Sequence, residues 1–189
     1  MSGPRNEVRI IAGRWRGRRL RFPADAGIRP TPDRVRETLF NWLQSDIAGA
    51  RCLDLFAGSG ALGIEALSRG ADSVVLVERD ARVAAYLRQT LKSLDAPGGE
   101  VRLGDAATFL RSAGRRFDLV FLDPPFAEQA LAPLLAVLAA GRQLAPQGLV
   151  YIEHAARDGL PTLPAGFAPH RSKRAGEVSY HLLAWEEAG

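Results

Sequence analysis

The 189-residue sequence contains one cysteine, three histidines and no long hydrophobic run. Because Cys52 has no partner cysteine, an intrachain disulfide is excluded, which fits a reducing compartment. Cys52 lies in an apolar segment, where an inert buried thiol is expected rather than a nucleophile. The three histidines, His154, His170 and His181, show no ligand spacing with cysteines or carboxylates, so no metal site is predicted.

Membrane segments are missing too. No stretch approaches the length of a bilayer-spanning helix, and residues 1–7 lack the apolar core of a signal peptide. Neither an internal repeat nor a low-complexity tract is present. With 47% hydrophobic residues and a mean hydropathy of −0.07, the chain is expected to be a soluble, globular protein of the cytoplasm. Its length predicts one domain with a sizeable core.

Lysine is scarce as well, since 23 of the 25 basic residues are arginine. The charge is unevenly placed: residues 1–40 hold ten arginines and four acidic residues, a balance of +6. The remaining 149 residues have a balance of −2, so the net charge of +4 comes from the N-terminal segment. This asymmetry indicates an arm that contacts a polyanion while the rest of the chain has another task.

From residue 51 onward, strand-like and helix-like segments alternate. Strands are predicted at 51–56, 73–78, 100–103, 117–122 and 148–153, and helices at 61–69, 80–94, 106–113 and 128–141. Apolar strands separated by helices predict a parallel sheet that is covered on both faces. Segments 166–173 and 178–185 predict a final antiparallel pair. In such sheets, ligands bind beyond the carboxyl ends of the strands.

The first fifty residues are predicted to form a hairpin and a helix. Segments 8–12 and 18–22 flank a glycine-containing turn and are typical of a short hairpin. Thr31 is expected to be the N-cap of the helix, with Pro32 at its first position. One apolar stripe of this helix would be formed by Val35, Leu39, Trp42 and Leu43.

The sequence Asp123-Pro124-Pro125-Phe126 follows the apolar segment 117–122 and is the most informative motif. The two prolines stiffen the backbone and cannot donate hydrogen bonds. The loop therefore offers acceptors, namely the Asp123 carboxylate and the carbonyls of Asp123 and Pro124, beside the aromatic face of Phe126. This set suits a planar base whose exocyclic amine donates its protons while its ring stacks. The alternative is an ordinary turn after a strand.

A glycine-rich loop, Ala57–Gly63, follows the first predicted strand of the sheet. Its glycines let the backbone turn sharply and approach a ligand. Twenty residues after Gly58, Glu78 ends the next strand, where a carboxylate can accept hydrogen bonds from ribose hydroxyls. Asp105, after the third strand, either receives an adenine amine or caps the following helix. The arrangement predicts an adenosine-containing cofactor.

The spacing of Gly58, Gly60 and Gly63 also satisfies the pattern of dinucleotide-binding enzymes, so a nicotinamide-dependent oxidoreductase is an alternative. Asp54 argues against it, because a carboxylate just before the loop would oppose a pyrophosphate and would suit a sulfonium or ammonium cation. The Asp123 loop also has no evident task in hydride transfer.

The segments Asp54–Gly60 and Asp123–Phe126, with Glu78, resemble class I S-adenosylmethionine-dependent methyltransferases that modify amino groups. Segments Arg9–Leu20 and Arg29–Leu43 are similar to the RsmD family of bacterial methyltransferases, as is the later sequence Gly176-Glu177-Val178-Ser179-Tyr180. The resemblance covers essentially the whole chain.

The resemblance implies a fold, a reaction and a partner. The fold is a Rossmann-like α/β sheet of seven strands, mostly parallel with an antiparallel last strand, and helices on both faces. A basic hairpin extension (1–30) would precede the methyltransferase domain (31–189). The reaction is methyl transfer from S-adenosylmethionine, leaving S-adenosylhomocysteine, to N2 of guanine 966 of 16S rRNA. The partner is the 30S subunit or its late precursor, and we expect a monomer without a metal or a membrane contact.

The site residues expected from the motifs and the resemblance form three groups. The amine would be bound by Asp123, Pro124, Pro125 and Phe126. The cofactor would be bound by Asp54, Phe56, Gly58, Ser59, Gly60, Glu78, Arg79, Asp105, Ala106 and Asp123. The RNA would be contacted by Arg14, Trp15, Arg16, Arg18 and Arg19, and by a second basic cluster of Arg171, Lys173 and Arg174.

Several alternatives stay open. The arginines around Trp15 could form a solvated charge run around a core tryptophan, and Arg34 and Arg36 could face the cofactor or be solvated on a helix. The substrate amine could belong to DNA adenine or a protein glutamine. A non-catalytic RNA-binding protein with a vestigial pocket is a further alternative, against which the intact Asp123 loop and Glu78 argue.

Overall fold

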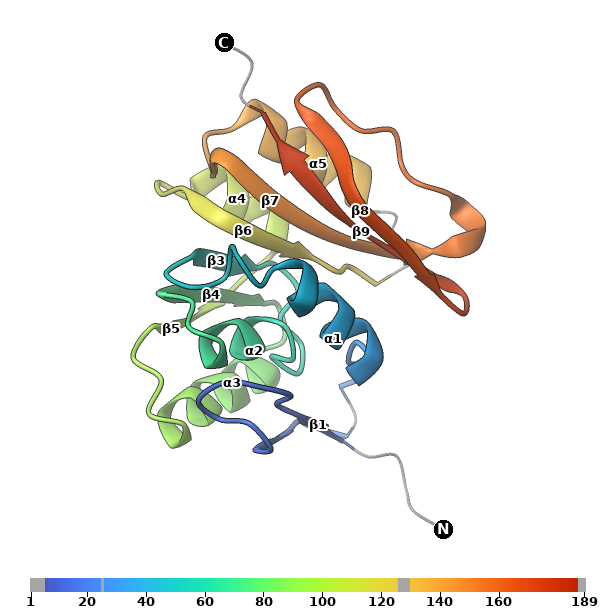
Figure 1. The fold of residues 1–189 in the computed structure, drawn as a ribbon. Helices are drawn as coiled ribbons and strands as arrows, with labels where there is room; N and C mark the ends of the chain where they lie inside the picture. The colour runs from blue at the N-terminus through green and yellow to red at the C-terminus, as the bar shows by residue number, and fades with distance from the viewer. Residues whose placement is uncertain (1–5, 25, 126–129, 187–189) are drawn as a thin grey trace.

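The computed structural model describes residues 6–24, 26–125 and 130–186, and its centre is a seven-stranded sheet (Figure 1). The strands lie in the order β5-β4-β3-β6-β7-β9-β8. Their bounds are β3 Arg51–Asp54, β4 Ser73–Glu78, β5 Gly99–Leu103, β6 Phe117–Leu122, β7 Leu144–Ala155, β8 Phe167–Ala175 and β9 Val178–Trp185. Strands β3 to β7 are parallel, whereas β9 is antiparallel to both of its neighbours. The predicted sheet with an antiparallel last strand is confirmed.

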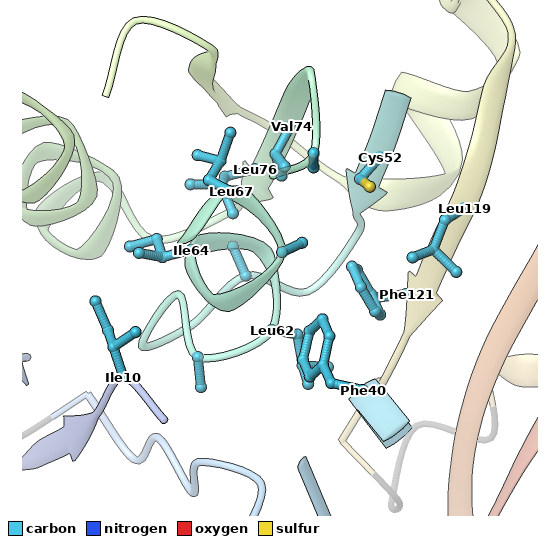
Figure 2. Packing of buried hydrophobic residues seen from close by; sticks show 14 of the residues in the cluster. Ile10, Phe40, Cys52, Leu62, Ile64, Leu67, Val74, Leu76, Leu119 and Phe121 are labelled. Atoms are coloured by element: carbon cyan, nitrogen blue, oxygen red, sulfur yellow. The ribbon is translucent and has the colours of Figure 1, made fainter. Parts of the chain in front are cut away.

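Both faces of the sheet are buried by helices. Cys52 and Phe121 belong to one apolar cluster, whereas the adjacent Leu53 and Leu122 belong to a second. The helices over the first cluster are α1 (Asp33–Trp42), α2 (Gly63–Ser68) and α3 (Ala81–Ser93), and those over the second are α4 (Ala106–Ser112) and α5 (Leu131–Ala140). Figure 2 shows part of the first cluster, with Phe40 of α1 close to Phe121 of β6. Alternating burial on two faces explains why the strands read as continuous apolar runs.

The N-terminal segment forms the predicted hairpin and packs on the first cluster. Its strands, β1 (Glu7–Arg9) and β2 (Arg19–Arg21), pair antiparallel with Val8 opposite Leu20, and both of these side chains are buried. The turn approaches α2 closely: Gly13 has φ +81°, and a Cβ there would lie 1.8 Å from the Ser68 carbonyl oxygen. Only glycine can therefore occupy position 13 without displacing the hairpin.

The start of α1 differs from the prediction. The N-cap position is held by Pro32 without a side-chain hydrogen bond, and the helix begins at Asp33. The Thr31 hydroxyl is not a cap; it lies 3.3 Å from Asp123 Oδ2 and 3.0 Å from Glu153 Oε1. Local sequence could not reveal this contact, because Asp123 follows β6 and Glu153 lies on β7, both about a hundred residues away.

Arg36 is buried, so the interpretation of it as a solvated residue on a helix is wrong. Its side chain is 1% exposed. The guanidinium donates to the carbonyls of Thr31 and Arg9, and forms ion pairs with Asp33 at 2.5 Å and Glu65 at 3.4 Å. Arg36 therefore ties the hairpin, α1 and α2 together.

Other element boundaries shift by a few residues. Strand β7 begins at Leu144, earlier than the predicted 148, and α2 begins at Gly63 instead of the predicted 61. Helix α5 begins at Leu131, since residues 126–129 lie outside the described residues. A short 3₁₀ helix, η2 (Ala156–Asp158), follows β7. In the described ranges, no helix has the length and apolarity needed to cross a membrane.

Candidate active site

A cavity of about 1260 Å³ lies at the carboxyl ends of β3, β4, β5, β6 and β7. This is the edge at which open α/β sheets bind ligands. It gathers predicted site residues from four separate loops: Asp54, Phe56, Gly58, Ser59, Glu78, Arg79, Asp105, Ala106, Asp123, Pro124 and Pro125. Phe126 lies outside the described residues. The segment Ala26–Pro32, which precedes α1, and Val178 at the start of β9 complete much of the lining.

Gly60 does not line the cavity. Its φ of +78° is in the left-handed region, and a Cβ there would lie 2.6 Å from Ile64 and 3.0 Å from Leu87. Its role is therefore to let the glycine loop pass close to α2 and α3, while Gly58 and Ser59 line the cavity.

Glu78 holds the glycine loop in place. Its Oε2 accepts the Gly58 N–H at 3.0 Å, and its Oε1 accepts the Asp80 N–H at 2.8 Å. A carboxylate has about four acceptor positions, so two remain for hydroxyl groups of a ligand. The two backbone bonds fix the orientation in which they are presented.

Asp54 lies at the floor of the cavity and is 2% exposed. Its Oδ2 accepts the Gly63 N–H at 3.0 Å. Burial raises the pKa of Asp54 to about 7, against which its backbone hydrogen bonds act. A cation placed beside this carboxyl would favour its ionised form.

Asp105 caps α4, so the capping interpretation is correct. Its Oδ1 accepts the Thr108 N–H at 2.9 Å and the Thr108 hydroxyl at 3.1 Å. The backbone bond from Thr108 holds the pKa of Asp105 below its ordinary value. The residue also lines the cavity, so capping does not exclude contact with a ligand.

A second carboxylate, Glu153, accompanies the Asp123 loop. It follows Ile152 on β7, which pairs with Leu122 just before Asp123 on β6. The Thr31 hydroxyl lies between the two carboxyls, and the Tyr151 hydroxyl donates to Glu153 Oε1 at 2.8 Å. Burial, Glu153 and then Asp54 raise the pKa of Asp123 well above its ordinary value, and burial raises the pKa of Glu153. Each of the two carboxyls therefore takes up a proton at a higher pH than an ordinary carboxyl does.

Sequence reasoning missed Glu153 and gave Thr31 the wrong partners. A signal for Glu153 was present, because it ends a predicted strand, as Glu78 does. The same rule that marks strand ends as ligand-binding positions would have included it.

The predicted RNA-contacting residues fall into two exposed groups. Arg14, Arg16, Arg18 and Arg19 are exposed on the hairpin segment, and Arg171, Lys173 and Arg174 are exposed on the edge strand β8. Trp15 differs: it is 8% exposed, belongs to the first apolar cluster and donates its backbone N–H to Ser68 Oγ at 3.0 Å. Its burial favours the core tryptophan over a stacking platform.

The sheet order, with helices on both faces and an antiparallel last strand, is that of the class I methyltransferase fold. A family model described as "Conserved hypothetical protein 95" matches residues 8–184. The chain belongs to this family, the RsmD family of methyltransferases.

Known proteins agree with this assignment. "Ribosomal RNA small subunit methyltransferase D" of Escherichia coli strain K12 is 47% identical over 183 residues, which cover 97% of this chain and 92% of that protein. The solved structure of the Escherichia coli protein yhhF has a TM-score of 0.90 at 45% identity and covers 96% of this chain and 99% of that one. An RNA methyltransferase from Salinibacter ruber, in complex with S-adenosyl-L-homocysteine, has a TM-score of 0.63 at 23% identity, covering 85% and 96%. This last likeness shows the shared fold.

Proposed function

We propose that this protein transfers a methyl group from S-adenosylmethionine to the exocyclic N2 of a guanine in 16S rRNA. The single observation that carries the proposal is the cavity that joins the glycine loop, Glu78 and the Asp123 loop. The relative named as a small-subunit rRNA methyltransferase supports the RNA class, and guanine 966 follows from the family resemblance. The protein would act as a monomer in the cytoplasm, on the 30S subunit or a late precursor.

The cofactor side of the cavity suits S-adenosylmethionine. Glu78 would accept the ribose hydroxyls, Asp105 and Ala106 would meet the adenine, and Asp54 would face the cationic methionine part. Phe56, Gly58, Ser59 and Arg79 would complete the site, and no metal is part of the proposal. The cofactor supplies an electrophilic methyl group when bound. The complex of the Salinibacter ruber protein with S-adenosyl-L-homocysteine supports this choice.

The substrate side must activate a poor nucleophile. The lone pair of guanine N2 is conjugated with the ring, so the amine attacks only when that lone pair is localised. Asp123 and the Pro124 carbonyl would accept the two amine protons and draw the nitrogen out of the ring plane. Phe126 is proposed to stack on the base. Catalysis would come from positioning and from acceptors aimed at the developing charge, on a base that has left its stack.

The test is labelled methyl transfer from S-adenosylmethionine to 30S subunits that lack the modification, followed by nucleoside digestion. N2-methylguanosine in the small-subunit rRNA is the expected product. Another methylated nucleoside, or transfer only to DNA or protein, would refute the assignment.

Ligand binding separates the proposal from a nicotinamide-dependent oxidoreductase. S-adenosylhomocysteine is expected to raise the melting temperature of the protein, whereas NAD is expected to leave it unchanged. Replacing Glu78 with glutamine should weaken S-adenosylhomocysteine binding about tenfold or more, because the charged acceptor is replaced by a neutral amide. Calorimetric titration measures this affinity. Glu100→Gln is the matched control, because Glu100 pairs with Arg115 at the surface of β5. Equal affinities in the two variants would contradict the role of Glu78.

The exposed arginines are expected to bind RNA phosphates. Replacing Arg14 and Arg16 with alanine should weaken 30S binding and reduce the slope of log affinity against log salt by about 1 for each phosphate that is no longer neutralised. Filter binding over a range of salt concentrations measures the slope. Arg142→Ala is the control, because Arg142 is exposed just before β7, at the sheet edge opposite the cavity. An unchanged slope would assign the hairpin arginines to a solvated surface.

A further inference from the structure

One hydroxyl group lies between the two carboxylates of the substrate side. Thr31 Oγ1 is 3.3 Å from Asp123 Oδ2 and 3.0 Å from Glu153 Oε1. A threonine hydroxyl has one proton to donate and lone pairs that accept. It can therefore donate to one carboxylate while it accepts a proton from the other, and these two roles can exchange.

The three groups all line the cavity but differ in their exposure. Asp123 is half-buried and lies in the loop that would hold the amine, whereas Thr31 is 6% exposed and Glu153 is 5% exposed. Glu153 also receives the Tyr151 hydroxyl at 2.8 Å, from a side chain with 0% exposure. Asp123 is thus the most exposed of the three groups, whereas Thr31 and Glu153 are buried in the wall of the cavity.

We propose that Asp123, Thr31 and Glu153 form a proton path that carries the proton lost by the methylated amine from Asp123 to the more deeply buried Glu153. This inference rests on the proposed function, because the proton comes from the N2 amine. Asp123 would touch the substrate; Thr31 and Glu153 act through it.

The step balances without a further reactant. The N2 lone pair forms the new N–C bond while the C–S bond breaks and its electron pair stays on sulfur. The nitrogen, now positively charged, gives one proton to the Asp123 carboxylate. The Asp123 O–H then donates its proton to Thr31 Oγ1, which passes its own hydroxyl proton to Glu153 Oε1. Asp123 is again a carboxylate, Thr31 is again a hydroxyl, and Glu153 is a neutral acid.

The surroundings favour uptake of a proton by this group. Among the described residues, the titratable side chains facing it are acids: Asp54 ends β3, Tyr151 lies on β7, and Tyr180 of β9 adjoins Tyr151. Negative charge from Glu153 and Asp54 adds to burial in raising the pKa of Asp123. A proton that enters the path therefore relieves repulsion between buried acids.

Thr31 offers the most direct test, because valine has the same shape without the hydroxyl. In single-turnover methyl transfer to 30S subunits with saturating S-adenosylmethionine, Thr31→Val is expected to slow the reaction about tenfold or more. Thr31→Ser is expected to restore the rate relative to Thr31→Val, because it keeps the hydroxyl. Equal rates for the two variants would overturn the path. A wild-type protein that forms no N2-methylguanosine would instead refute the proposed function, and the path with it.

Glu153→Gln gives an independent readout in the pH dependence. The rate of methyl transfer is expected to fall. The acidic limb of the pH–rate profile is expected to shift to lower pH, because the Glu153 charge no longer raises the pKa of Asp123. A slower variant with an unshifted limb would mean that Glu153 has only a structural role, and would overturn the path.

Thermal unfolding tests the same coupling without activity. Because folding raises the pKa of both carboxyls, their contribution to stability is present below the unfolded pKa and is lost as pH rises through the folded pKa. The melting temperature of Glu153→Gln should therefore fall less than that of the wild type between about pH 5 and about pH 8. Parallel curves would show that the carboxyls are not coupled and would overturn the path.

Discussion

Replacing Asp123 with alanine is expected to reduce methyl transfer at least about a thousandfold while S-adenosylhomocysteine affinity stays within about tenfold. The carboxylate lies beside Pro124 at the end of β6, where it would take both an amine hydrogen bond and the departing proton. Alanine removes both at once. The Glu78 side of the cavity stays in place, because its hydrogen bonds run to Gly58 and Asp80 rather than to Asp123.

Single-turnover kinetics and calorimetry on the same preparation separate these effects. Asp118→Ala is the matched control, since Asp118 lies on β6, the strand that leads to Asp123, but pairs with Arg51 at the surface, at 3.0 Å. It should keep its methyl-transfer rate. If Asp123→Ala abolished S-adenosylhomocysteine binding, Asp123 would belong to the cofactor site. If it kept most of its rate, the amine would be bound elsewhere.

Much of this architecture could be predicted from the sequence because its signals are local. Apolar runs at 73–78 and 117–122, separated by helical segments, indicate a parallel sheet. This prediction does not require knowledge of the order of the strands in the sheet. The positions that end such runs, Glu78 and Asp123, then share one edge of the sheet. The position of the cavity can therefore be predicted from the parallel topology and from the two residues, Glu78 and Asp123, at the ends of the apolar runs.

What could not be predicted depends on contacts between distant segments. Trp15 and Arg36 lie in an arginine-rich stretch that resembles a solvated arm, yet both are buried where the hairpin meets α2. Thr31 looks like a helix cap because Pro32 and Asp33 follow it, but two distant carboxylates, Asp123 after β6 and Glu153 on β7, determine its contacts. A glycine in the sequence is similarly ambiguous. Gly60 fits the cofactor-binding motif, but the close approach of Ile64 and Leu87 explains why position 60 is a glycine.

Glu65 is expected to contribute the largest single stabilisation of the N-terminal extension. Its side chain is 0% exposed and accepts the backbone N–H groups of Ile11 at 2.8 Å and Ala12 at 3.0 Å. It also pairs with Arg69 at 2.7 Å and with the buried Arg36 at 3.4 Å. Glu65→Ala leaves a buried guanidinium with one carboxylate fewer and two amides without an acceptor. We expect the free energy of unfolding to fall by about 3–5 kcal/mol, the usual result of breaking a buried ion pair from one side.

Urea denaturation measures this decrease, and hydrogen exchange locates it, since the Ile11 and Ala12 amides should exchange faster. Glu37→Ala is the control, because Glu37 is exposed on the neighbouring α1. Glu65→Gln keeps an acceptor for the amides but not the charge, so it should be destabilised less than Glu65→Ala. A decrease below about 1 kcal/mol in Glu65→Ala would mean that the apolar packing of Ile10, Trp15 and Leu20 holds the hairpin without the ion pair. The basic arm would then be docked by packing alone, and RNA-binding residues could be engineered on it without regard to Glu65.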